Sequence, residues 1–317
     1  MRVKDFLIKN YSLVLNNDRF EGETFYEFVK HRLYEYKKGL NLIDENEFCI
    51  LLDNYNFKGK KTKLRFINAV SVIIDECIHI LQCCYKGDIW RAGELLEDLI
   101  LTRHKLNRYL EDYYLNCFQH KLLKCDVLFR MRDCTKGEQP KDCWHVPYEK
   151  RNITSSSRYS FAGVPALYLA DSIDTANKEV GELEECNDRW YSEFILNNKL
   201  FMLDLTIPSK DTTDIADKTE TIDYLLTFPI RLLCSIQTVS SGACEEYYFP
   251  QLFCHWLSKE NKDISIKFYG IAYSSTIHLG GVNYVFPAFY SSKEPIKGHS
   301  PILLELFEAT SPKLYNP

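Results

Sequence analysis

The chain has 317 residues, a length that fits one large domain or two of ordinary size. Hydrophobic residues make up 45% and charged residues 26% of the sequence, a balance that excludes a disordered or fibrous chain. Residues 1–125 hold 20 Lys and Arg against 18 Asp and Glu, whereas the remainder holds 19 against 26, so nucleic-acid binding is not expected of the acidic C-terminal part.

The N-terminal part of the chain is predicted to be a helical bundle. Charges are spread over residues 1–20, so we expect no signal peptide, and no apolar run approaches the roughly 18 residues of a membrane span, so we predict a cytoplasmic protein. Apolar residues recur at helical spacing in 23–38, 61–84 is a long apolar segment, and Asp88 can cap the helix that follows. A further helix is predicted over 109–118. Residues 1–122 are therefore expected to form an all-α domain for regulation or assembly.

Residues 123–317 are predicted to form a mixed α/β domain. Pro, Gly and Ser residues separate short β-rich runs, which occupy 126–132, 165–170, 199–207, 231–239, 267–275 and 283–290. Helical stretches are expected around 174–185, 218–228 and 247–258. The predicted fold class is therefore α+β, an N-terminal all-α bundle followed by a mixed α/β domain.

Several familiar catalytic motifs are absent from the sequence. It contains no glycine-rich dinucleotide fingerprint, P-loop, G-x-S-x-G or H-E-x-x-H motif. No Arg is followed four to six positions later by His, the pair expected of a helical-bundle nuclease. The 12 Cys contain no C-x-x-C pair and the 8 His have no ligand spacing, so we expect no metal. The cysteines are interpreted as core residues, and His145 and His255 as core or surface residues.

One stretch combines residue types that can carry chemistry. A turn, a short strand and a capped helix are predicted in succession, with Arg158 before the turn, Tyr168 on the strand and Glu179 on the helix. Glu179 lies at the edge of an apolar helix face, which is expected to comprise Ala176, Val180 and Leu183. Taken alone, this spacing also allows a buried Arg158–Glu179 ion pair beside a core tyrosine.

The spacing of these three residues resembles the RES family, which is named for its Arg, Glu and Ser residues. In that family a Tyr follows the Arg after ten positions and a Glu follows eleven further on, as Arg158, Tyr168 and Glu179 do. Downstream, residues 246–251, 273–275 and 283–287 resemble later elements of the family. Ser275 is matched to the family Ser, with Ser274 as the alternative. Residues 156–157 are Ser-Ser where the family has Gly-Gly, and 159–160 are Tyr-Ser where it has Trp-Asn.

The resemblance implies NAD-consuming chemistry on a fold similar to the diphtheria-toxin class of ADP-ribosyltransferases. Glu179 would stabilise the ribosyl cation that forms as nicotinamide leaves, Tyr168 would offer the nicotinamide ring a flat face, and Arg158 would hold phosphate. Ser275 and Asn283 would add neutral hydrogen bonds. The expected activity is that of an NAD glycohydrolase, with NAD as substrate and no further cofactor.

The resemblance also implies a biological setting. Short RES proteins are toxins neutralised by an antitoxin, so we expect a toxin or an anti-phage abortive-infection effector with an antitoxin or defence-system partner. The N-terminal helices resemble the HEPN-like extension of longer RES proteins, and a homo-oligomer is expected. Three alternatives stay open: ADP-ribosyl transfer to a protein, transfer to phosphate, and a non-catalytic nucleotide-binding module.

Overall fold

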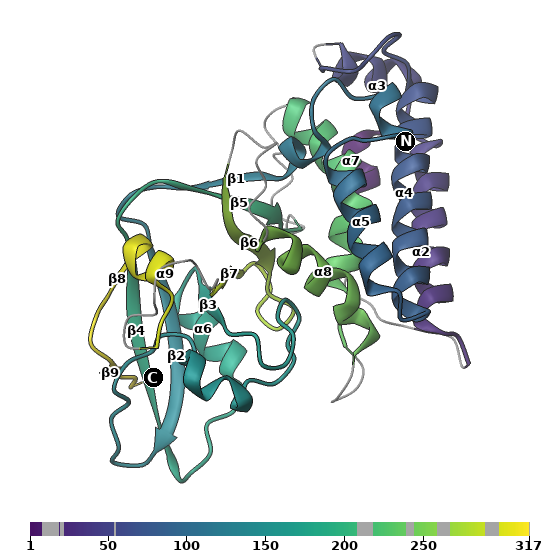
Figure 1. Ribbon diagram of the computed structural model, residues 1–317. Coiled ribbons are helices and arrows are strands. Elements are labelled where there is room, and N and C mark those ends of the chain that lie inside the picture. The colour runs from purple at the N-terminus through teal and green to yellow at the C-terminus, as the bar shows by residue number, and fades with distance from the viewer. Residues whose placement is uncertain are drawn as a thin grey trace. The chain divides into compact units, whose positions relative to one another are not determined.

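The chain forms two compact units, each assembled from two separate stretches of sequence. The computed structural model describes residues 1–7, 19, 22–53, 55–207, 218–238, 244–258, 267–288 and 298–316. The first unit comprises Met1–Gln119 and Ile207–Trp256, and the second comprises His120–Thr206 and Leu257–Pro317. Helices form the first unit and a mixed sheet dominates the second (Figure 1), which confirms the predicted α+β fold class.

The first unit is helical. Its N-terminal stretch contains α2 (Phe25–Leu40), α3 (Glu45–Leu52), α4 (Lys63–Tyr85) and α5 (Ile89–Ile100), and α2, α4 and α5 lie side by side (Figure 1). Thr24 and Glu27 form a capping box at the start of α2, and the Asp88 carboxylate accepts a hydrogen bond from the Arg91 backbone N–H at 3.1 Å. The predicted cap at Asp88 is therefore confirmed.

The later stretch of the chain completes the core of this unit. It supplies α7 (Lys218–Ser235), the short 3-10 helix η4 (Glu245–Tyr247) and α8 (Tyr248–Leu257). The Tyr36 hydroxyl of α2 donates to the Leu225 carbonyl at 2.7 Å, and the Tyr36 ring stacks on Phe228 at 4.2 Å. The Tyr114 hydroxyl donates to the Leu226 carbonyl at 2.7 Å. Two N-terminal tyrosines therefore donate hydrogen bonds to backbone carbonyls of α7.

Two sequence predictions in this unit are wrong. Residues 231–239 were expected to be a strand, but 231–235 belong to α7, because an apolar run that is buried all round looks alike in a helix and a strand. Residues 109–118 were expected to be a helix, but the structure has only the short 3-10 helices η1 (Leu106–Arg108) and η2 (Tyr114–Phe118). Tyr114 and Phe118 reach the core from η2, whereas Tyr113 is exposed.

The second unit is built on one mixed sheet. Its strands are β1 (Gln119–Leu122), β2 (Val127–Thr135), β3 (Ala166–Ala170), β4 (Asn187–Leu196), β5 (Leu200–Leu205), β6 (Phe268–Ser274), β7 (Val282–Pro287), β8 (Phe307–Ala309) and β9 (Lys313–Leu314). The order is β1-β5-β6-β7-β3-β2-β4-β8, and β9 also pairs with β4. Strands β5 and β6 run parallel, and α7 and α8 lie in the connection between them.

Different layers cover the two faces of β2. Leu128 packs in a core with Leu167, Phe194 and Leu303, the last from α9 (Pro301–Leu306). Met131 faces the other way and packs with Ala170 and with Ala176 of α6 (Ile173–Val180). The loop between β2 and β3 contains the 3-10 helix η3 (Tyr148–Ile153). The sheet therefore separates a layer formed by α6 from a layer formed by α9 and the β2–β3 loop.

Within the described residues, no helix combines the length and the apolar character that crossing a bilayer requires. The division of roles between residues 1–122 and 123–317 stays a prediction.

Candidate active site

The turn after β3 holds the start of α6 against the sheet. The Asp171 backbone N–H donates to the Val282 carbonyl at 2.9 Å, and the Asp171 carboxylate accepts from the Val282 N–H at 3.1 Å. Ser172 caps the helix, because its hydroxyl accepts from the Thr175 N–H at 3.2 Å. Gly181, with a φ of 89°, ends the helix one residue after Val180. These contacts set the direction in which the last turn of α6 points.

Glu179, in that last turn, contacts two of the residues proposed from sequence. Its Oε1 atom accepts hydrogen bonds from the Ser275 hydroxyl and from the Asn283 side-chain amide, each at 2.6 Å. Ser275 and Asn283 are buried, whereas Glu179 is exposed. Both bonds are on one oxygen, and Oε2 has no hydrogen bond within the described parts of the chain. The arrangement fixes a carboxylate that can still meet a ligand.

The turn that follows β6 holds Ser275 in place. The Ser275 hydroxyl accepts from the backbone N–H groups of Ile277 and His278, at 3.2 and 2.8 Å. His278 Nδ1 lies 2.9 Å from the Thr175 hydroxyl of α6. A Cβ at Gly281 would lie 2.6 Å from that same hydroxyl, so only glycine allows this approach. The geometry places Ser275, not Ser274, against Glu179.

Tyr168 contacts the segment that carries Arg158. Its hydroxyl lies 2.5 Å from the Ser157 hydroxyl and 3.1 Å from that of Ser160. The two serines also bond through their backbones, with Ser157 N–H donating to the Ser160 carbonyl at 2.9 Å. Arg158 and Tyr159 therefore occupy the corner of a tight turn that Tyr168 holds to β3.

Tyr168 and Asn283 lie on one face of the sheet. Ala170 is paired with Asn283 and Tyr168 with Val285, and alternate residues of a strand share a face. Tyr168 and Asn283 are therefore diagonal neighbours across β3 and β7. The Glu179 cluster and the Tyr168 hydroxyl with its serine turn thus belong to one region of the second unit.

The structure argues against one alternative and corrects one detail. Among the described residues, the partners of Glu179 are Ser275 and Asn283, so the Arg158–Glu179 ion pair that the spacing allowed does not form. Ala176 is buried as expected, but Val180 and Leu183 are exposed by 37% and 47%, so the predicted apolar face of α6 is wrong beyond its first turns. The helix ends at Val180, before that face could continue.

Sequence reasoning missed the residues that position this site. Ser157 and Ser160 hold the Arg158 turn, and Thr175 and His278 tie the Ser275 turn to α6. The first pair had a signal, because positions 157 and 160 are where the sequence departs from the family pattern. The second pair had none, since 103 positions separate its members.

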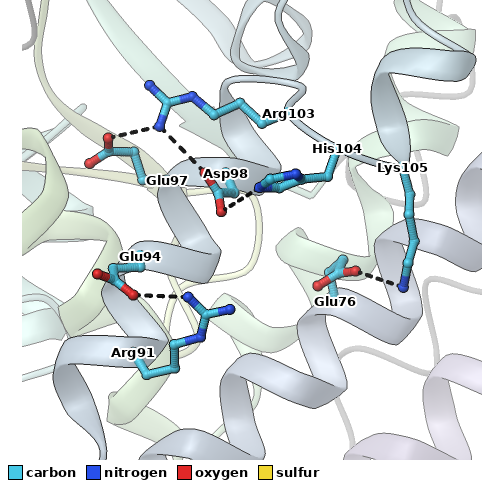
Figure 2. A network of polar contacts seen from close by, with 8 residues as sticks. All are labelled: Glu76, Arg91, Glu94, Glu97, Asp98, Arg103, His104 and Lys105. Atoms are coloured by element: carbon cyan, nitrogen blue, oxygen red, sulfur yellow. Dashed lines mark hydrogen bonds and ion pairs between the residues drawn. The ribbon is translucent and has the colours of Figure 1, made fainter.

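The first unit carries a separate group of charged residues at α4 and α5. Figure 2 shows its ion pairs: Arg91 with Glu94 at 2.9 Å, Arg103 with Glu97 and Asp98 at 3.4 Å, His104 with Asp98 at 3.1 Å and Lys105 with Glu76 at 3.4 Å. All of these residues except Glu94 and Glu97 border a cavity of about 390 Å³. Each cation drawn has an acidic neighbour, so the group offers no excess positive charge for a phosphate backbone. The described residues contain no group of three or more potential metal ligands.

The comparisons with known proteins cover the part of the chain that contains the candidate site. The RES domain family matches residues 127–302, which include all five proposed site residues. The "Putative toxin YopC" of Bacillus subtilis (strain 168) is 28% identical over 206 residues, covering 58% of this chain and 45% of that protein. The chain thus spans about half the length of this curated relative. No solved structure matches the chain.

The likeness of the N-terminal helices to a HEPN extension stays a prediction. With more than half of its length matched, the chain belongs to the RES domain family.

Proposed function

We propose that the protein cleaves NAD to nicotinamide and ADP-ribose at the site formed by Arg158, Tyr168, Glu179, Ser275 and Asn283. The observation that carries the proposal is the Glu179 carboxylate, whose Oε1 is held by Ser275 and Asn283 at 2.6 Å while the side chain stays exposed. A fixed, accessible negative charge is what a developing ribosyl cation requires.

The reaction needs charge stabilisation more than proton transfer. When the bond between nicotinamide and C1′ of the ribose breaks, its electron pair goes to the ring, and nicotinamide leaves as a neutral base. The ribose is left with oxocarbenium character, as in glycoside hydrolysis. Glu179 faces this positive charge. Water then adds to C1′ and loses a proton, which gives ADP-ribose.

Arg158 and Tyr168 are proposed to bind the dinucleotide. Arg158 offers five N–H donors that match the geometry of a phosphate, and the Ser157–Ser160 turn fixes its backbone. The half-buried Tyr168 ring offers a flat surface to nicotinamide, while its hydroxyl bonds to the same turn. One tyrosine would therefore couple the binding of the nicotinamide ring to the binding of the pyrophosphate.

We further propose that this activity makes the protein a toxin or an abortive-infection effector acting in the cytoplasm, with an antitoxin or a defence-system protein as partner. Membership of the RES domain family and the word toxin in the name of the B. subtilis relative support this setting. Depletion of NAD would stop growth. The N-terminal helices are proposed to serve regulation or self-association.

Product analysis tests the proposed function and separates it from its alternatives. The purified full chain is incubated with NAD, with and without inorganic phosphate or added protein, and all products are identified by mass. Free ADP-ribose and nicotinamide in equal amounts indicate hydrolysis. ADP-ribose-1″-phosphate or a modified protein would identify another acceptor, and intact NAD with bound nucleotide would leave only a binding module.

A further inference from the structure

The second unit contains a cavity that shares no residue with the site proposed above. Its volume is about 680 Å³, within the range of small-molecule sites, and it lies between the β2–β3 loop and the start of α9. Arg132 lines it and shares a face of β2 with Leu128, whereas Met131 on the other face packs against α6. The cavity is therefore on the opposite side of β2 from α6, which carries Glu179.

The cavity lining has more basic than acidic side chains, whereas the C-terminal part of the chain has more acidic than basic ones. Arg132, Lys141 and Lys150 line it against two acids, Asp142 and Glu149. Residues 126–317 as a whole hold 19 Lys and Arg against 26 Asp and Glu. A local basic excess within an acidic part of the chain favours an anionic ligand.

Two buried polar atoms, one on a lining residue and one on a neighbour of a lining residue, have no hydrogen-bond partner within the described residues. His299 lines the cavity with a side chain only 7% exposed, and its Nδ1 atom has no hydrogen-bond partner among the described residues. Arg130 lies two positions before Arg132, on the same face of β2. Its buried Nη1 atom also has no hydrogen-bond partner among the described residues. Burial, and next the charge of Arg132, lower the pKa of Arg130 to about 10. Buried polar groups without partners are rare in folded proteins and mark places where a ligand or ordered water completes the bonding.

The acid nearest to these groups is already engaged in the cavity wall. The Asp142 carboxylate accepts a hydrogen bond from the Trp144 backbone N–H at 3.0 Å, and its Oδ2 atom lies 3.7 Å from His299 Nε2. The backbone carbonyl of Asp142 accepts a hydrogen bond from the Arg132 guanidinium at 3.4 Å. Since Nε2 faces Asp142, the Nδ1 atom is the His299 nitrogen that remains for a ligand. Asp142 thus fixes the wall, while Arg130 Nη1 and His299 Nδ1 have no hydrogen-bond partner in the parts of the chain that the structure describes.

Trp144 adds a flat apolar surface to the same wall. Its ring meets Phe194 edge to face at 5.0 Å and lies 6.1 Å from the His299 ring, so its position is set by packing. A fixed, half-buried indole that lines a cavity is suited to a planar ring.

We propose that this cavity binds a nucleoside phosphate. The phosphate would meet Arg132, Lys141 and Lys150, the base would lie against Trp144, and a hydroxyl or amine would bond to His299 Nδ1. A free phosphate would bind the basic side chains but would not contact Trp144. A free nucleoside would contact Trp144 and His299 Nδ1 but would leave the basic side chains without a partner in the ligand. The site is distinct from the Glu179 region and does not depend on NAD cleavage.

Calorimetric titration of the full chain with AMP, inorganic pyrophosphate and adenosine tests this proposal. We expect AMP to bind more tightly than either other probe. The double variant Lys141→Ala/Lys150→Ala, which changes two exposed side chains, should weaken AMP binding by about tenfold. The matched variant Lys124→Ala/Lys136→Ala, also exposed but outside the cavity, should bind AMP normally.

Two further variants locate the bound AMP. Trp144→Leu should weaken AMP but not pyrophosphate, whereas Arg158→Met should leave AMP binding at this site unchanged. Thermal unfolding of each variant shows whether it is folded. The proposal is wrong if AMP does not bind at millimolar concentration, if the Lys141→Ala/Lys150→Ala variant binds AMP as the wild type does, or if Arg158→Met abolishes the binding. Equal affinity for pyrophosphate and AMP would contradict the nucleoside assignment.

Discussion

Tyr168 combines an observed structural contact with a proposed role in binding. Its hydroxyl bonds to Ser157 and Ser160 and so holds the turn that carries Arg158. Its half-buried ring is on the sheet face that also carries Asn283. The hydroxyl and the ring therefore contribute separately, and substitution can separate them.

Replacing Tyr168 by Phe should raise KM for NAD more than it lowers kcat. The variant keeps the flat ring but loses the hydroxyl that anchors the Arg158 turn, so KM should rise by roughly three- to tenfold, the equivalent of one ordinary hydrogen bond, while kcat changes little. Steady-state kinetics of NAD cleavage measure both constants. Tyr168→Ala is the comparison and should lose both contributions. A Phe variant as impaired as the Ala variant would contradict this division.

His145 should make the protein less stable in acid. It is buried, its Nδ1 atom donates to the Val146 carbonyl at 2.8 Å, and its Nε2 atom accepts from the Ser300 N–H at 2.9 Å. Burial lowers its pKa from 6.5 to about 4. Between these two values the unfolded chain binds a proton that the folded chain does not, so the free energy of unfolding should fall as the pH drops, by roughly 3 kcal/mol in total.

Urea unfolding at pH 7, 6, 5 and 4.5 measures this contribution. Burial also lowers the pKa of His299, which adds a loss of the same sign. His145→Gln should therefore flatten the pH dependence without removing it. An identical slope in the variant and the wild type would show that His145 is not the group responsible.

At the scale of elements, the site depends on the contact between α6 and the turn after β6. Thr175 and His278 bond across this contact, and Gly281 allows the close approach. Helix α6 presents Glu179 and the turn presents Ser275, so the hydrogen bond between them requires the two elements to stay together.

Gly281→Ala should impair NAD cleavage more than it impairs folding. The added methyl group would lie 2.6 Å from the Thr175 hydroxyl and 2.8 Å from its methyl group, which forces the turn away from α6. We expect kcat to fall by at least about tenfold as Ser275 leaves Glu179. Gly93→Ala is the control, because a Cβ there meets nothing within 4 Å and helical alanine is favourable. Equal kcat in both variants would contradict this role for the turn.

The elements also show what the sequence allows one to predict. Helices α2 and α4 and strands β3 and β6 follow from periodicity and turn residues, and the Arg158–Tyr168–Glu179 spacing indicates the family. The strand β4 was missed because its first residues, Asn187 to Arg189, are polar, and it is recognised only by its pairing with β2. The Thr175–His278 contact joins distant segments, and local patterns carry no information about such pairs.

At the scale of the whole molecule, the RES region contributes to both compact units. Helices α7 and α8 belong to the matched residues 127–302, yet they pack within the first unit. The large side chains of α7 that this packing buries include Ile222, Leu225, Phe228 and Leu232. Removal of the N-terminal helices would expose this apolar surface to water.

Splitting the chain tests this dependence. Residues 119–317 expressed alone should aggregate, because α7 loses Tyr36, Tyr114 and the other side chains that cover it. Co-expressed residues 1–118 and 119–317 should copurify as a one-to-one complex. Size-exclusion chromatography with light scattering distinguishes these results. A monodisperse, folded 119–317 fragment would show that the first unit is dispensable for folding.

In the proposed reaction, Glu179 stabilises positive charge during NAD cleavage. Glu179→Gln tests it most directly, because the Gln carbonyl can still accept from Ser275 and Asn283 while the negative charge is lost. Exposed Glu182→Gln, nearby in the chain, is the matched control. The measurement is kcat for NAD cleavage with thermal unfolding on the same preparations. We expect kcat to be lower by about 10²–10³-fold at an unchanged melting temperature, with the control at wild-type activity. Near-normal cleavage by folded Glu179→Gln would contradict it.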